Sequence, residues 1–253
     1  MVELCTMSIR ELKCWVAAMI DSILTHGKLE EQHTAADYLP WVRSLISRMK
    51  EEPDGLARIR QRIGLAKELM NEAFPIGLLA SRFFDESDQV SLALKVGNQP
   101  YDATVSDLRP SGSSLQYIEV TVAGEGEDDY LRMRTLEEQG QVSGLGRVTK
   151  SGTKKTGLKI SVENAMVSQT EVLSREHHSI ASAIERKLAK SYPPHTLLLV
   201  AFDDTMAFDR PDNISNIKAT VSGFLPRLKG FHSVAVVGLQ KRMLLSWRTE
   251  SAT

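Results

Sequence analysis

This 253-residue chain has few cysteines, no long apolar run and a formal net charge of only -1. Cys5 and Cys14, its only cysteines, supply neither a disulfide framework nor a thiolate metal cluster. The apolar run from Leu197 to Phe202 is far shorter than the roughly 20 residues of a membrane-spanning helix. The first residues interleave charged with apolar side chains, unlike a signal peptide. These absences predict a cytoplasmic protein that does not contact a membrane.

The charge balance and the missing motifs exclude several function classes. Lys and Arg number 31 against 32 Asp and Glu, so any basic surface for nucleic acid would have to be local. Neither the G-x-x-x-x-G-K-[ST] order of a phosphate-binding loop nor the G-x-S-x-G order of a serine hydrolase is present. The adjacent His177 and His178 would project about 100° apart on a helix, which argues against a shared zinc ion.

Apolar residues at three and four residue spacings predict helices in the first part of the chain. The first helix should end near Gly27, and the second should be capped by Asp37 and end at Pro53. A third helix is expected from Asp54 to Pro75. Its predicted inward residues are Leu56, Ile59, Ile63, Ala66, Met70 and Ala73.

After residue 84 the apolar period falls to two, which predicts strands. A meander is expected over residues 92–96, 101–105 and 115–123, followed by helices and strands in alternation up to residue 248. This order predicts an α/β fold with a mixed central sheet flanked by helices, rather than a doubly wound nucleotide fold. We expect an N-terminal helical region over residues 1–84, which could itself bind a partner protein, and an α/β domain over residues 85–253.

Two acidic residues lie on neighbouring predicted strands. Asp102 closely follows Pro100, and Glu119 shares its face of the next strand with Thr121. If the two carboxylates meet, they offer the hard oxygen ligands that suit Mg²⁺ or Mn²⁺, and such an ion can activate water against a phosphodiester. The alternative is a pair of exposed strand acids with no joint role.

The order of Pro100, Asp102, an acid on the next strand and a helix returning to a strand resembles the PD-(D/E)xK, restriction-endonuclease-like nucleases. In that family the Asp and the Glu of an E-x-K triplet bind Mg²⁺, and the Lys orients the attacking water. Over roughly residues 65 to 205, the resemblance implies a Mg²⁺- or Mn²⁺-dependent DNA endonuclease or exonuclease with Asp102 and Glu119 as metal ligands. Thr121 stands at the lysine position, where a hydroxyl cannot supply a cation. A catalytically inactive nuclease-fold protein, acting as an interaction or assembly module, is therefore the second interpretation.

Some members of this family carry the lysine on a nearby helix. Lys187 lies on one helical stripe with Ile180 and Ile184, at the border of the predicted apolar face. From there it could reach Glu119 and replace the missing lysine. Alternatively, its stem could lie along the core edge while its ammonium stays in water.

A further feature of the family is an acid on the helix before the meander. Glu68 and Glu72 stand one turn apart on the third predicted helix, and Glu72 is next to the inward Ala73. Either could complete the metal shell with Asp102 and Glu119. Otherwise both are ordinary solvated helix acids.

A glycine-rich segment between Glu138 and Glu163 contains cations and no acid. This pattern predicts either a flexible hairpin that neutralises nucleic-acid phosphates or a solvated hairpin tip. Its cations are Arg147, Lys150, Lys154, Lys155 and Lys159. The third predicted helix is also locally basic, which indicates either a solvated face or help in binding DNA; its cations are Arg58, Arg60, Arg62 and Lys67.

Overall fold

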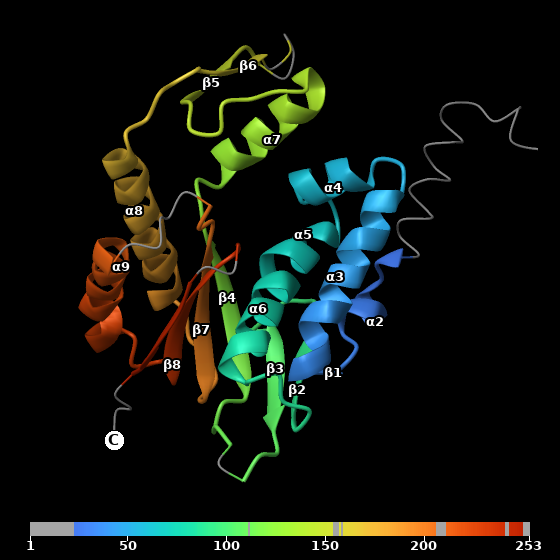
Figure 1. The fold of residues 1–253 in the computed structure, drawn as a ribbon, viewed down its shortest axis with the longest axis vertical. Helices are drawn as coiled ribbons and strands as arrows, with labels where there is room; N and C mark the ends of the chain where they lie inside the picture. Colours follow the sequence, from blue (N-terminus) through green and yellow to red (C-terminus); the bar gives the residue numbers. More distant parts are fainter. Residues whose placement is uncertain are drawn as a thin grey trace, which may run out of the picture.

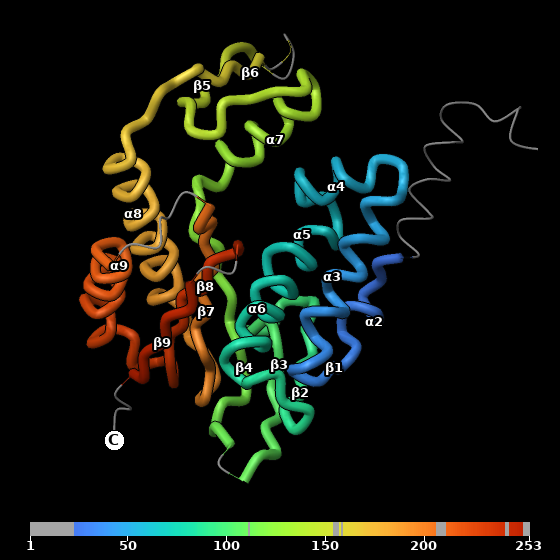
Figure 2. Tube along the Cα trace, viewed as in Figure 1, coloured from blue at the N-terminus to red at the C-terminus, as the bar shows by residue number. Residues whose placement is uncertain are grey.

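The protein has a mixed α/β fold in which helices cover both faces of one seven-stranded sheet (Figures 1 and 2). The computed structural model describes residues 23–110, 112–153, 157, 159–205, 211–240 and 243–249. The expected fold class, a mixed sheet flanked by helices and preceded by a helical region, is confirmed. The first predicted helix up to residue 22, with Cys5 and Cys14, lies outside the described residues.

The central sheet has the strand order β1-β2-β3-β4-β7-β8-β9. The β4-β7 and β7-β8 pairs are parallel, and the other four pairs are antiparallel. All residues of β7 and β8 are buried, which explains why these apolar runs occupy the middle of the parallel part. The strands are β1 (His33–Thr34), β2 (Val90–Leu94), β3 (Ala103–Asp107), β4 (Tyr117–Ala123), β7 (Thr196–Phe202), β8 (Ser233–Gly238) and β9 (Leu244–Arg248).

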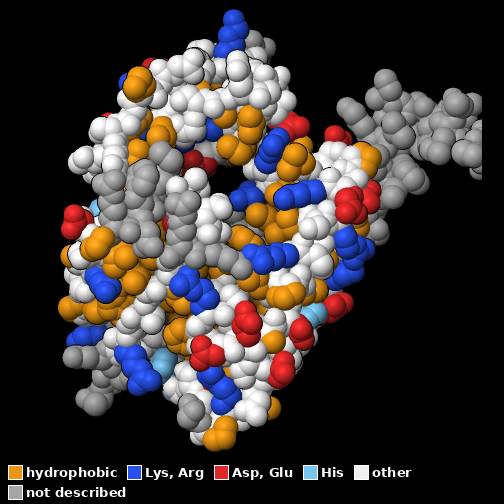
Figure 3. Space-filling view, viewed as in Figure 1, with side chains coloured by type: hydrophobic (Ala, Val, Ile, Leu, Met, Phe, Trp, Pro, Cys, Tyr) orange, Lys and Arg blue, Asp and Glu red, His pale blue; other side chains and the backbone are white. Residues whose placement is uncertain are grey.

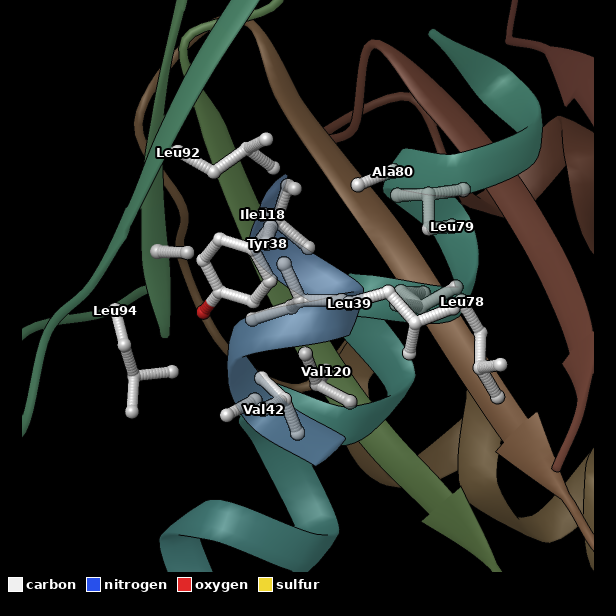
Figure 4. Close-up of a cluster of buried hydrophobic side chains, with 14 of the residues drawn as sticks. Tyr38, Leu39, Val42, Leu78, Leu79, Ala80, Leu92, Leu94, Ile118 and Val120 are labelled. Atoms are coloured by element: carbon white, nitrogen blue, oxygen red, sulfur yellow. The ribbon is translucent and has the colours of Figure 1, made fainter. Parts of the chain in front are cut away.

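The N-terminal helices pack against one face of this sheet. After α2 (His26–Leu29), the helices α3 (Ala35–Glu51) and α6 (Phe74–Phe83) contact each other and the strands. Their side chains and those of β2 and β4 form one continuous core that extends across residue 84 (Figure 4). Members of this core include Tyr38, Leu39, Val42, Leu78, Leu79, Ala80, Leu92, Leu94, Ile118 and Val120.

The opposite face is covered by α8 (Gln169–Leu188) and α9 (Pro211–Phe224), the latter followed by the short 3-10 helix η2 (Leu225–Arg227). Ser168 caps α8, because its side chain accepts a hydrogen bond from the backbone N–H of Glu171. The apolar stripe of α8 is buried against β4 and β7. The stripe includes Ile180, Ala183 and Ile184. In the part of the chain that the structure describes, no helix has the length and apolar character needed to cross a membrane.

An arm projects between β4 and α8, at the top of Figure 1. It consists of α7 (Glu127–Gln139) and a hairpin of β5 (Val148–Ser151) and β6 (Lys159–Val162). The buried Arg132 of α7 holds the hairpin, because its guanidinium donates to the carbonyl oxygen of Gly146 at 2.9 Å. The same guanidinium contacts Glu125 at 2.6 Å and Asp129 at 3.0 Å.

The third predicted helix is broken, which corrects the expectation from apolar spacing. It comprises α4 (Gly55–Gln61), α5 (Ala66–Glu68) and a π-helix, η1 (Leu69–Ala73), that leads into α6. Arg62 and Gly64 adopt left-handed backbone angles, with φ of 55° and 57°, and these interrupt the helix. As a result Leu56 and Ile63, predicted to point inward, are 40% and 45% exposed.

Two predicted helix boundaries also differ from the structure. Pro75 does not end the helix, because it stands in the first turn of α6, where its missing N–H is tolerated. Thr34, not Asp37, caps α3: the Thr34 side chain accepts from the backbone N–H of Asp37 at 3.2 Å. Asp37 instead takes a place in the first helical turn, where its charge favours the helix dipole.

Candidate functional site

The structure brings Asp102 and Glu119 to one cross-strand position. Ala103 of β3 lies opposite Ile118 of β4, so Asp102, one residue earlier, stands opposite Glu119 and on the same face. The backbone N–H of Asp102 donates to the carbonyl oxygen of Ile118 at 2.8 Å, and Asp102 Oδ2 accepts from the N–H of Val120 at 2.7 Å. The Asp102 carboxylate therefore occupies the point where β3 separates from β4.

Lys187 of α8 reaches this position. Its Nζ donates to Glu119 Oε1 at 2.6 Å, and the two side chains are only 16% and 8% exposed. The contact arises because α8 packs on β4 while its apolar stripe, including Ile180 and Ile184, is buried in the core. Of the two alternatives for Lys187, the structure thus shows the one in which the ammonium meets Glu119.

Burial, with a smaller contribution from neighbouring negative charge, raises the pKa of two carboxyl groups around this point. Burial, followed by the charge of Glu119, raises the pKa of Asp102 to about 6, against the lowering effects of the Val120 hydrogen bond and Lys187. Burial, followed by the charge of Asp102, raises the pKa of Glu72 to about 8. Glu72 is therefore mostly protonated at neutral pH. The site holds more buried carboxylates than its cations neutralise.

Glu72 does not join Asp102 and Glu119 in the three-ligand set that the sequence predicted. It lies on η1, which contacts β4 from the side of the N-terminal helices. Across the described residues, no group of three or more His, Cys, Asp and Glu could hold a metal ion. One turn earlier, Glu68 Oε2 is buried and has no hydrogen-bond partner among the described residues. Two carboxylates, rather than three, are thus available as a shared donor set.

A cleft of about 970 Å³ is lined by Lys187, which contacts Glu119, and by Glu72, whereas Asp102 and Glu119 themselves are not part of its lining. Val120, Thr121 and Val122 of β4 line the cleft. They follow the part of β4 that pairs with β3, so no described strand covers this edge of β4 beside them. Figure 3 shows a hollow between the arm and the N-terminal helices, bordered by Lys and Arg side chains. The cations that line the cleft are Arg60, Arg62, Lys67, Arg175, Arg186 and Lys187.

The cleft carries a positive charge at neutral pH. Two of its acids, Glu125 and Asp129, are paired with the buried Arg132. Within the described ranges, Arg62, Lys67 and Arg186 lie in the lining without a salt bridge to any acid. Burial also lowers the pKa of Arg62, as expected for a guanidinium that has lost water and gained no counter-charge. Such a surface favours an anionic ligand.

The basic hairpin predicted from the sequence lies away from the cleft. Arg147, Lys150 and Lys159 are exposed and do not line it. Lys150 instead forms a salt bridge of 2.6 Å with Glu127 of α7. Lys154 and Lys155 lie outside the residues that the structure describes. The hairpin lies away from the cleft because α7, in the same arm, stands between the two.

Sequence reasoning missed the polar stripe of α8 that faces the cleft. Arg175, Ser179, Ser182 and Arg186 all line it. Their spacing of four, three and four residues places them on one helical face, beside the apolar stripe that carries Ile180. The signal was therefore present in the sequence as a second, polar periodicity. Its relation to the cleft depends on where β4 and α4 lie.

Comparison with protein-family models, with curated proteins and with solved structures finds no match for this chain. Its function is therefore inferred from the geometry and chemistry of its own residues.

Proposed function

We propose that this protein is a metal-dependent nuclease of the PD-(D/E)xK type, which hydrolyses phosphodiester bonds of DNA. The observation that carries the proposal is the 2.6 Å contact between Lys187 and Glu119, beside Asp102 and next to the cleft. The contact supplies, from α8, the cation that the threonine at position 121 cannot supply. Two carboxylates and one ammonium then meet at one point, which is the group composition that the resemblance implies.

The donor set suits Mg²⁺ or Mn²⁺. Both ions prefer carboxylate oxygens, and Mg²⁺ is commonly held by one or two carboxylates together with water and substrate phosphate oxygens. Burial, followed by the charge of Glu119, raises the pKa of Asp102, and a bound divalent cation would favour the ionised carboxylate against both effects. Asp102 and Glu119 would hold the ion, which would polarise the phosphate and lower the pKa of a bound water.

The other residues have separate roles in this proposal. Lys187 stabilises charge on the phosphate under attack, and its contact with Glu119 fixes the position of its ammonium. Arg62 and Arg186 bind phosphates further along the cleft. Glu72, protonated at neutral pH, donates a hydrogen bond to a phosphate oxygen rather than binding metal.

The test is an assay of the purified protein with Mg²⁺ or Mn²⁺ on linear single-stranded, blunt duplex and branched DNA. We expect cleavage that Asp102→Asn, Glu119→Gln and Lys187→Met each reduce at least about 100-fold. Glu127→Gln is the matched control, because Glu127 also pairs with a lysine at 2.6 Å but lies on the exposed arm. Cleavage that survives the Asp102 and Glu119 substitutions would show that the activity belongs to another site or a contaminant.

A second function is favoured by one specific observation. Among the described residues no group of three metal-binding side chains is assembled, and Lys187 already neutralises Glu119. These facts suit a nuclease-like protein that binds nucleic acid or a protein partner without cleaving, as an assembly module. Calorimetric titration with Mn²⁺ separates the two functions: heat of binding that disappears in Glu119→Gln supports the nuclease, and its absence in the wild type supports the module.

Cytoplasmic location is part of the proposal, since a nuclease of this kind requires access to nucleic acid. It is also the compartment in which a chain with two cysteines and no disulfide framework is expected to work.

A further inference from the structure

We propose that the cleft binds a single nucleic-acid strand, and that the contact between α4 and α7 keeps duplex out. This inference rests on the proposed function, because it names the substrate of the same site. The carboxylate pair by itself does not distinguish one strand from a duplex, whereas the shape of the cleft gives a physical reason for that selection.

The helices α4 and α7 meet at one side of the cleft. The two helices pack against each other, and Arg60 Nη1 of α4 lies 3.3 Å from Glu137 Oε2 of α7. Residues of both helices line the cleft, including Gln61 and Tyr130. Since η1 and β4 border the same space, the N-terminal helices and the arm meet across one side of the cleft (Figure 3).

The α4-α7 contact borders the cleft on one side. A duplex carries a second strand across grooves that are about 8.5 and 7.5 Å deep, so it needs that side to be open. A duplex therefore enters only if α4 moves away from α7. A single strand enters with the contact intact.

Arg62 provides a fixed contact for the backbone of that strand. Its Nε donates to Asn71 Oδ1 at 3.1 Å, and its Nη1 donates to the carbonyl oxygen of Ile59 at 2.6 Å. These two bonds hold a partly buried guanidinium in the lining without a carboxylate partner in the described structure. A partly buried cation held in this way is suited to a phosphate, which satisfies its remaining donors.

Tyr130 provides a surface for a base. Tyr130 is 43% exposed and belongs to the cleft lining, and Met133 lies one turn further along the same helix. Proteins that bind single strands combine a basic groove with exposed aromatic rings on which bases stack. Bases of a duplex are already stacked and paired, so they cannot use such a ring.

The test measures binding without cleavage, by fluorescence anisotropy in EDTA. The probes are a 12-nucleotide DNA strand, the same sequence as RNA, and the matched blunt DNA duplex. We expect the single strands to bind at least tenfold more tightly than the duplex. Tyr130→Ala and Arg62→Ala should each weaken single-strand binding by about tenfold, while Tyr130→Phe keeps it. Arg147→Ala, on the exposed hairpin, is the control that should leave affinity unchanged.

A cross-link tests the role of the α4-α7 contact. In a Cys5→Ser, Cys14→Ser background, Arg60→Cys and Glu137→Cys are joined by a short bismaleimide. We expect the cross-linked protein to bind the single strand within about threefold of the uncross-linked protein. Loss of that binding, or a duplex affinity equal to the single-strand affinity before cross-linking, would overturn the inference. Single-strand binding without metal-dependent cleavage would leave it standing and would refute only the proposed nuclease activity.

Discussion

Lys187 Nζ lies 2.6 Å from Glu119 Oε1, and the two side chains are 16% and 8% exposed. The salt bridge between Lys150 and Glu127 has the same 2.6 Å length, but its side chains are 36% and 71% exposed. Water screens the second pair and hardly reaches the first. These two lysine-glutamate pairs therefore differ mainly in burial, and each serves as a control for the other.

Removal of the buried cation should destabilise the fold. We expect Lys187→Met to lower the free energy of unfolding at pH 7 by about 3 kcal/mol, because Glu119 is left buried beside Asp102 without its counter-charge. Lys150→Met should change it by less than about 0.5 kcal/mol. Urea unfolding measures both values. Equal effects of the two substitutions would show that burial does not strengthen the Glu119 pair.

The position of the catalytic cation should be exchangeable between helix and strand. Thr121 follows Glu119 by two residues on the same face of β4, about 7 Å along the strand, and lines the cleft. In the Lys187→Met protein, which we expect to lose at least about 100-fold in cleavage rate, Thr121→Lys should regain at least about tenfold.

Thr121→Met in the same background is the matched control, since it adds a similar length without charge. If the methionine restores as much activity as the lysine, the rescue comes from packing in the cleft and not from a cation. If neither restores any activity, position 121 is not equivalent to the family's lysine position in this fold.

Glu72 should make the stability of the protein fall with pH. Its pKa is raised from 4.5 to about 8, so between these values the folded state keeps a proton that the unfolded state has lost. The stabilising contribution is complete below about pH 4.5 and is lost as pH rises through about 8, with a slope of up to about 1.4 kcal/mol per pH unit.

Urea unfolding at about pH 5, 6.5 and 8 checks this expectation. Glu72→Gln should flatten the decline across this window, because glutamine does not titrate. The control is Glu51→Gln, at the exposed end of α3, which should leave the slope as it is in the wild type. A wild-type slope that persists in Glu72→Gln would assign the pH dependence to another group.

Arg132 should hold the hairpin of the arm in place. Its side chain is 5% exposed and connects Gly146, Asp129 and Glu125. We expect Arg132→Ala to speed amide hydrogen exchange over residues 143–151 at least about tenfold and to leave β7 and β8 protected. Arg134→Ala removes only an exposed pair with Glu138 on the same helix and should change neither. Unchanged exchange in Arg132→Ala would mean that β5 and β6 hold their place on α7 without it.

Local sequence patterns determined the elements and the faces of the sheet. The period of two in β4 correctly separates Ile118 and Val120, which enter the core, from Glu119. The apolar spacing in α8 correctly predicts that Ile180 and Ile184 are buried. Such patterns are readable because strand and helix geometry fix which side chains share a side. The left-handed turn at Arg62 escaped this reasoning, since a backbone angle leaves no trace in apolar spacing.

The tertiary structure alone decided which of these side chains meet. Lys187 and Glu119 are 68 positions apart, and their contact depends on how α8 returns across the β4-β7 pair. The cleft likewise depends on α4 reaching α7, and α4 ends at the helix break at Arg62, which apolar spacing does not predict. The sequence by itself thus determined one acid on each of two neighbouring strands. The packing of distant segments decided which cation completes the site and which space lies in front of it, because these contacts are set by the burial of the whole core.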